Sequence, residues 1–457
     1  MSFAPQARRL ASVFASNASG TVLGQAVQLV TIPLQLRFLG AEQFGLLVLF
    51  NSFVMAGSMA DAGIGPTTLR YVARKCHSRR SVEHVVASGL TVLCAMFLGL
   101  SVLALLGAAA YAHWALPPET ANAMGPVVYV GFVLLALGAS MLCGLGHNIL
   151  KGLQQYKRFA VLESIHRMGL PLVTTATAVC TGQVTWVLVS SCVWMLMSAC
   201  LTLRVVIVRA GIAIRLTRHL HYFRKRMLSF SSWTWVQAVF GYLGTQADRL
   251  IIASVMSLST LAAYAVAMSV TNAALAVMSA GASFLIPESA SRVNDMDWLR
   301  RSFTRFTFLL SAVSALSIVA ILPFAELLLS AWLGAGSATL VFPILVPLLW
   351  TFSNAATSIP GNYMATAMGH SKAVALMGAA GNSIVLISMI AGGMTFGLYG
   401  VLGGKLSSIL VGFCIRCELA RRVFLIPNAA AAATRMVWPT LLGCFLVLPL
   451  SWYYLVP

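Results

Sequence analysis

Thirteen apolar runs, each close to the length that crosses a bilayer, constrain what this chain can fold into. An α-helix needs about 20 apolar residues to span the hydrocarbon core. The runs extend approximately over residues 12–37, 44–67, 85–110, 124–146, 160–180, 184–203, 228–252, 261–285, 306–324, 340–366, 373–391, 398–415 and 436–456. Because 59% of the 457 residues are hydrophobic and only 9% are charged, against about 25% charged in soluble domains, one soluble core cannot hold them. The predicted class is an all-α polytopic membrane protein with about 12 to 14 transmembrane helices.

The basic residues predict how these runs cross the membrane. With a cytoplasmic N-terminus, all but three of the 30 Lys and Arg residues fall in segments on the cytoplasmic side, where membrane proteins collect positive charge. The net charge of +19 is therefore an orientation signal, and no nucleic-acid partner is expected. The longest such segment, residues 204–227, is expected to be a helix on the membrane surface or a solvated basic linker.

The three exceptions are Arg37, Arg249 and Lys405, which fall at or inside apolar runs. A basic residue near the centre of a spanning helix costs about 2.5 to 3.5 kcal/mol on insertion scales, so a partner or an aqueous cavity must compensate it. Asp248 directly precedes Arg249, but adjacent helical residues point about 100° apart. We therefore expect these two side chains to find separate partners rather than form one salt bridge.

A weak internal repeat predicts how the runs are grouped. Shifting the chain by 218 residues places Gln28 on Gln246, Gly63 on Gly281 and Arg74 on Arg292. Transporters are commonly built from two related bundles, so we predict a duplicated six-plus-six arrangement. Its parts are an N-terminal six-helix lobe at 1–203, a basic linker at 204–227, a C-terminal six-helix lobe at 228–420 and an additional helix at 421–457.

The first and seventh runs carry matching polar stripes. Their members recur at three- and four-residue steps and so share one helix face: Asn17, Thr21, Gln25 and Gln28 in one run, and Gln237, Gly241, Thr245 and Asp248 in the other. One interpretation is hydrogen bonding between helices, which is common in membrane bundles. The other, which two matching stripes favour, is a shared polar cavity.

The sequence gives little support for enzymatic, redox or metal chemistry. The one close cysteine pair, Cys414 and Cys417, has no histidine or second pair nearby, so no metal site and no cofactor are expected. A membrane glycosyltransferase or ligase needs a sizeable outer loop with active-site residues, yet the outer segments hold only Glu42, Glu119 and Glu326 as acids. We expect no catalytic residues, and a protein that is not an enzyme.

Two segments carry ordered patterns of charged, aromatic and glycine residues. Residues 32–74 contain an arginine, leucine-glycine, aromatic-glycine, aspartate-x-glycine and a second arginine, at Arg37, Leu39, Gly40, Phe44, Gly45, Asp61, Gly63 and Arg70. The seventh run carries an aspartate-arginine pair followed by a tyrosine, at Asp248, Arg249 and Tyr264. With these motifs, the chain resembles bacterial polysaccharide-biosynthesis transporters, the Wzx-like O-antigen flippases. It departs from the family pattern at Ala263, where the family often has glycine.

The resemblance implies the multidrug, oligosaccharidyl-lipid and polysaccharide exporter superfamily. Its fold has two six-helix lobes in a pseudo-twofold arrangement around a central cavity that opens to each side in turn. The implied cargo is a polyprenyl-pyrophosphate-linked oligosaccharide, moved to the periplasmic leaflet of the bacterial inner membrane for O-antigen or exopolysaccharide synthesis. Implied partners are membrane lipids, a polysaccharide polymerase and glycosyltransferases. The alternatives are a multidrug or small-molecule exporter of the same superfamily and a passive lipid scramblase.

Each polar residue then has an expected role. Arginine suits a pyrophosphate because its donor fork binds phosphate oxygens bidentately. The expected set for the pyrophosphate is Arg37, Arg70, Arg249 and Lys405, and the set for the sugars is Asn17, Gln25, Gln28 and Gln237. Asp61 and Asp248 are the expected sites for a coupling proton or sodium ion, which would make the protein an antiporter.

Overall fold

The computed structural model describes residues 4–56, 61, 63–75, 78–114, 125–213, 215–217 and 227–455. Within these ranges the side chains of residues 4–21, 107–114, 229, 230, 233, 237, 287 and 443–455 are outside the description. All regular structure in the described ranges is helical, without a strand. The predicted all-α class is confirmed.

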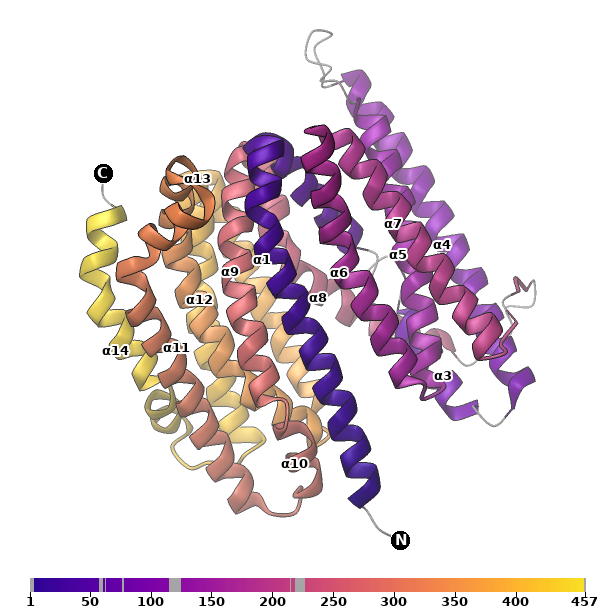
Figure 1. Cartoon of the computed structure of the whole chain (residues 1–457). Helices are drawn as coiled ribbons and strands as arrows, with labels where there is room; N and C mark the ends of the chain where they lie inside the picture. Colours follow the sequence, from indigo (N-terminus) through magenta and orange to yellow (C-terminus); the bar gives the residue numbers. More distant parts are fainter. Residues whose placement is uncertain are drawn as a thin grey trace. The chain divides into compact units, whose positions relative to one another are not determined.

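Figure 1 shows the helices, with colours that follow the sequence from indigo at the N-terminus to yellow at the C-terminus. They are α1 (Ala4–Met55), α3 (Ile64–Lys75), α4 (Arg79–Trp114), α5 (Pro126–Gly152), α6 (Tyr156–Thr181), α7 (Val184–Arg204), the π-helix η1 (Val205–Arg209), α8 (Leu228–Val255), α9 (Leu258–Ala282), α10 (Leu285–Ser291), α11 (Met296–Leu333), α12 (Ala335–Ala367), α13 (Ser371–Arg422) and α14 (Ala429–Leu455). Among the described residues, eight helices are long and apolar enough to cross a membrane. The chain is therefore a multi-pass membrane protein.

The two longest helices, α1 and α13, each extend over parts of two predicted apolar runs. Their backbone is non-helical at Gly40 (φ 75°, ψ 167°) and at Gly397 (φ 60°, ψ −136°). Glycine adopts a positive φ at little cost because it has no Cβ. Each element is thus two helices joined at a glycine, and both breaks fall between predicted runs.

The second predicted run, 44–67, is not one continuous helix. α1 ends at Met55 and α3 begins at Ile64. Gly63, with φ 72°, interrupts the helical path, and the Asp61 carboxylate accepts hydrogen bonds from the backbone amides of Gly63 (2.8 Å) and Gly65 (3.1 Å). A turn at Asp61 and Gly63 therefore interrupts the expected span, and its last residues, 64–67, belong to α3.

The described part of the linker is attached to α4. After η1, residues 210–213 and 215–217 are not helical. The backbone amide of Ala213 donates to Glu83 Oε1 (3.2 Å), and that of Thr217 donates to Thr91 Oγ1 (2.9 Å). Side chains of α4 thus bind two backbone amides of the described part of the linker. The choice between a surface helix and a solvated linker for residues 204–227 stays a prediction.

The chain forms two compact units. Unit 1 comprises Met1–Arg37 and Leu243–Pro457, and unit 2 comprises Phe38–Tyr242. Each has its own apolar core; that of unit 1 includes Phe303 stacked on Phe424, with ring centroids 4.2 Å apart. The boundaries predicted at residues 203, 227 and 420 stay a prediction, because they concern duplicated halves of the sequence rather than compact units.

Helix α14 joins unit 1 through buried hydroxyl groups. Thr440 Oγ1 lies 2.8 Å from Ser311 Oγ on α11 and 3.0 Å from Ser353 Oγ on α12. Ser314 Oγ extends this network to Ser353 at 2.7 Å. Hydroxyl groups that bond to one another across helices need no water, which suits a membrane interior. The described part of the run at 436–456 belongs to this single further helix, α14.

The two halves of α13 touch backbone to backbone. A Cβ on Gly400 would lie 1.8 Å from the carbonyl oxygen of Gly392, and a Cβ on Gly392 would lie 2.2 Å from the oxygen of Gly400. A main-chain oxygen cannot rotate away as a side chain can, so the turn at Gly397 requires glycine at both positions.

Replacing Gly400 with alanine should destabilise unit 1 by about 3 kcal/mol, the upper end for overpacking. The matched control is Gly403→Ala, where a Cβ meets nothing within 4 Å, and alanine there should be neutral or slightly stabilising because of its helix propensity. Unfolding midpoints of the purified variants in detergent measure both effects. Equal unfolding midpoints for Gly400→Ala and Gly403→Ala would contradict the backbone contact between Gly392 and Gly400.

Candidate functional site

Three buried polar side chains meet in unit 1. Asp248 of α8 is 4% exposed and forms a salt bridge with Lys405 of α13, which is 15% exposed. Tyr264 of α9 donates its hydroxyl hydrogen to Asp248 Oδ2 at 2.5 Å, and Lys405 Nζ donates to the Tyr264 oxygen at 2.7 Å. The lysine and the aspartate neutralise each other, so this cluster carries no net charge.

Arg249 takes a different partner from its neighbour. Its Nη1 donates to Gln246 Oε1 at 3.0 Å, whereas Asp248 pairs with Lys405. The expectation that Asp248 and Arg249 do not form one salt bridge is confirmed. Arg249 Nε is buried and has no hydrogen-bond partner among the described residues. A charged donor in that position is available to an anion.

The other predicted site residues are spread over both units. Asp61 caps the start of α3, on which Arg70 is half-buried. Arg37 is exposed at the end of the first half of α1. On that half, Gln25 is half-buried and Gln28 exposed, and the side chains of Asn17 and Gln237 lie outside the described part. Of the predicted residues with described side chains, the structure pairs only Asp248 with Lys405.

Unit 2 contains an ionic cluster that we did not predict. Glu163 of α6 lies between His147 of α5, whose Nδ1 is 3.0 Å from Glu163 Oε2, and Arg167, whose Nε donates to Glu163 Oε1 at 2.5 Å. The available signal was a glutamate inside the predicted run 160–180. The partners could not be foreseen, because His147 lies on the preceding helix.

Arg416, which directly follows the predicted apolar run 398–415, is a buried cation of unit 1. It is 3% exposed within α13, because that helix continues past the apolar run to Arg422. Its Nη1 donates to Thr357 Oγ1 (2.9 Å) and Ser358 Oγ (3.0 Å) of α12. Nη1 also lies 3.4 Å from the backbone oxygen of Asn354. Because Arg416 has no salt bridge to a described residue, neutral oxygens compensate this buried cation.

Ionisable residues inside a bundle of spanning helices commonly mark substrate or ion pathways, which is the kind of site that membrane transporters have. The sequence model of the polysaccharide biosynthesis protein family matches residues 10–292. The chain belongs to that family. The resemblance seen in the sequence is thereby confirmed.

Solved structures share its fold along nearly the whole chain. A lipid II flippase, MurJ, in an inward closed conformation has a TM-score of 0.73 at 12% identity, over 96% of this chain and 95% of that one. An inward-facing multidrug resistance MATE family transporter of the MOP superfamily has a TM-score of 0.59 at 12% identity, over 93% and 95%. A MOP superfamily transporter from Pyrococcus furiosus has 0.54 at 13%, over 96% of both. A search of the curated proteins found none that matches.

Proposed function

We propose that this protein is a flippase for a lipid-linked glycan. It moves a polyprenyl-pyrophosphate-linked oligosaccharide from the cytoplasmic to the periplasmic leaflet of the bacterial inner membrane, with the N-terminus in the cytoplasm. The family supports this proposal, as does the fold shared with a lipid II flippase. The observation that carries it is the buried Arg249 Nε, a charged donor with no described partner inside a membrane bundle.

The cargo chemistry matches these side chains. An uncompensated polar group in an apolar medium costs several kcal/mol, so a glycan needs polar groups along its route. We assign the pyrophosphate to Arg249, together with Arg37 and Arg70, because guanidinium groups bind phosphate oxygens bidentately. We assign hydrogen bonding with the sugar hydroxyls to the side-chain amides of the two polar stripes: Asn17, Gln25, Gln28 and Gln237.

The salt bridge changes the roles proposed for Lys405 and Asp248. Because Lys405 already pairs with Asp248, its ammonium attracts the pyrophosphate only when that pair opens. A proton on Asp248 would remove the attraction that holds Lys405. We therefore propose that Asp248 couples transport to a proton rather than to sodium, since Lys405 Nζ occupies the cation position beside the carboxylate. Asp61 is the second proposed coupling carboxylate, in unit 2.

Flipping by the purified protein tests this proposal. Proteoliposomes receive a fluorescent polyprenyl-pyrophosphate-linked oligosaccharide in one leaflet, and a membrane-impermeant quencher reports its arrival in the other. We expect transfer that requires the protein and accelerates under an imposed proton gradient. Transfer at the protein-free rate, together with export of cationic dyes, would favour the multidrug exporter. Transfer that requires the protein but has the same rate with and without an ion gradient would indicate a passive scramblase.

A further inference from the structure

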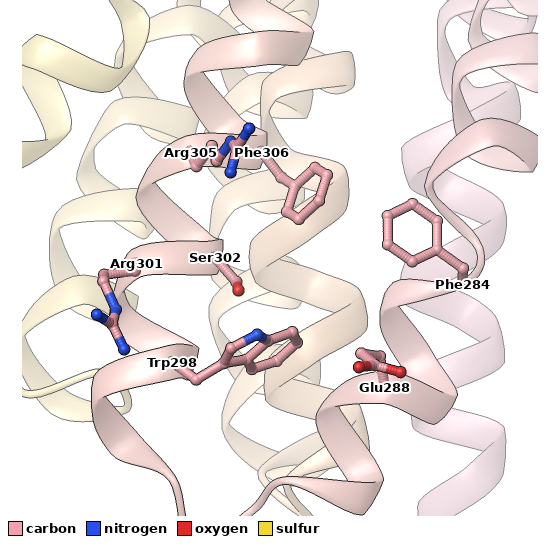
Figure 2. A pocket seen from close by; sticks show the side chains of 7 residues that line it. All are labelled: Phe284, Glu288, Trp298, Arg301, Ser302, Arg305 and Phe306. Carbon is pink, nitrogen blue, oxygen red and sulfur yellow. The ribbon is translucent and has the colours of Figure 1, made fainter.

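A pocket of about 520 Å³ lies in unit 1 where α10 approaches the first turns of α11. Its lining consists of Phe284, Glu288, Trp298, Arg301, Ser302, Arg305 and Phe306. In Figure 2, Trp298 and Phe306 extend from α11 toward Phe284 and Glu288, Arg305 lies beside Phe306, and Arg301 leaves α11 on the opposite side from Glu288. None of the residues assigned to the cargo or to coupling contributes to this pocket.

The charge of the pocket is positive. Its one acid, Glu288, pairs with Arg292 at 2.6 Å, and the Arg292 guanidinium lies 4.7 Å from the Trp298 ring centroid. Arg301 donates only to the backbone oxygen of Asp297 in its own helix, at 3.2 Å. Neither Arg301 nor Arg305 forms a salt bridge with a described residue. Two guanidinium groups are therefore available to an anion.

The rest of the pocket lining is largely aromatic. The rings of Phe284 and Phe306 meet edge to face, with centroids 5.3 Å apart. Trp298 is half-buried beside them, and Ser302 on the same helix face is buried. Aromatic side chains with one polar end favour the membrane–water interface. A ligand that fills this pocket needs both an anionic group and an apolar part.

The pocket lies at the end of unit 1 that is rich in basic residues. Arg300, within the first turns of α11, donates to the backbone oxygen of Phe424 at 2.8 Å. The start of α11 and the end of α13, with Arg421 and Arg422, are therefore at the same end of the unit. The apolar part of α11 begins only after Arg305, and basic residues collect where a spanning helix leaves the hydrocarbon. We therefore infer that the pocket lies at the level of the lipid headgroups.

We propose that this pocket binds one anionic phospholipid. Arg301 and Arg305 donate to its phosphate, and the faces of Trp298 and Phe306 contact the glycerol and the first methylenes of the acyl chains. The volume falls in the usual range for small-ligand sites, about 300 to 1,000 Å³. This lipid is a component of the bilayer and not the cargo, so the proposal does not depend on the proposed function.

Lipid titrations of the purified protein in detergent, followed by native mass spectrometry, test the site without transport. We expect phosphatidylglycerol to bind more tightly than phosphatidylcholine, with an affinity that falls as salt rises. The double variant Arg301→Gln/Arg305→Gln should bind phosphatidylglycerol roughly thirtyfold more weakly, from the usual contribution of a basic residue near an anionic lipid surface. The fold should survive, since both side chains are exposed.

The matched control is Arg421→Gln/Arg435→Gln, which removes two exposed arginines outside the pocket. It should change the affinity by less than about threefold, since it alters only the net charge. Trp298→Leu should weaken phosphatidylglycerol binding while leaving both arginines in place. Equal loss in the two double variants would overturn the proposal, as would equal binding of phosphatidylcholine. Competition by millimolar inorganic phosphate as effective as that by the lipid would also overturn it, because it would make the aromatic wall irrelevant.

Discussion

Replacing Lys405 with methionine should lower the free energy of unfolding by about 3 to 5 kcal/mol, the usual cost of stranding one charge of a buried ion pair. Asp248 is 4% exposed, and without the lysine it retains the Tyr264 hydroxyl and the backbone amide of Arg249 as donors. Two neutral donors compensate a carboxylate less well than an ammonium group does. Unfolding of the purified variant by a denaturing detergent measures the loss.

The double variant Asp248→Leu/Lys405→Met should recover most of that stability, since replacing a whole buried pair by apolar residues is often neutral. The double-mutant cycle isolates the pair from other effects of each change. The surface pair Glu418 and Arg422, in which the arginine side chain is 76% exposed, is the control: Glu418→Gln should cost less than about 1 kcal/mol. Additive losses at Asp248 and Lys405 would show that the two side chains do not interact.

Replacing Arg249 with alanine should reduce the rate of glycan flipping at least about thirtyfold, because removing one partner of a desolvated charged contact costs about 2 to 5 kcal/mol. Arg249→Lys should be intermediate, because an ammonium keeps the charge but loses the bidentate geometry. The measurement is the initial rate in proteoliposomes, normalised to the amount of folded protein.

The control for Arg249 is Arg421→Ala, which removes an exposed arginine at the end of α13 and should leave the rate unchanged. Gln246 accepts the hydrogen bond from Arg249 Nη1. Because Gln246→Ala removes this acceptor but keeps the guanidinium group, it should reduce the flipping rate less than Arg249→Ala does. A normal flipping rate in Arg249→Ala would remove this residue from the cargo route. Arg37 and Arg70 would then be the remaining residues assigned to the pyrophosphate.

The apolar runs were sufficient to predict most of the helices. In a bilayer a backbone must satisfy its own hydrogen bonds, so a run of about 20 apolar residues has few alternatives to a helix. The breaks at Gly40 and Gly397 fall between runs for the same local reason, since a glycine allows the turn. The interruption near Asp61 was missed because residues 44–67 are apolar enough for one span, whereas the Asp61 side chain favours a turn by bonding to backbone amides.

The pairing of side chains between helices could be predicted from the sequence only in part. The 100° offset between neighbouring helical residues already implied that Asp248 and Arg249 need separate partners. It could not indicate that Asp248 meets Lys405, 157 positions later. The same holds for Glu163 with His147, and for Arg416 with Thr357 and Ser358, because each pair joins two helices.

The sequence by itself determined the class of protein, the helices and the family, because hydrophobicity, helix formation and motif spacing are properties of continuous stretches of chain. Only the tertiary structure decided which buried charges are neutralised and which remain available. Lys405 changes from a free cation to the partner of Asp248, while Arg249 keeps a donor with no described partner. The reason is physical: the cost of a buried charge depends on the groups within a few ångströms, and helix packing brings those groups from distant parts of the chain.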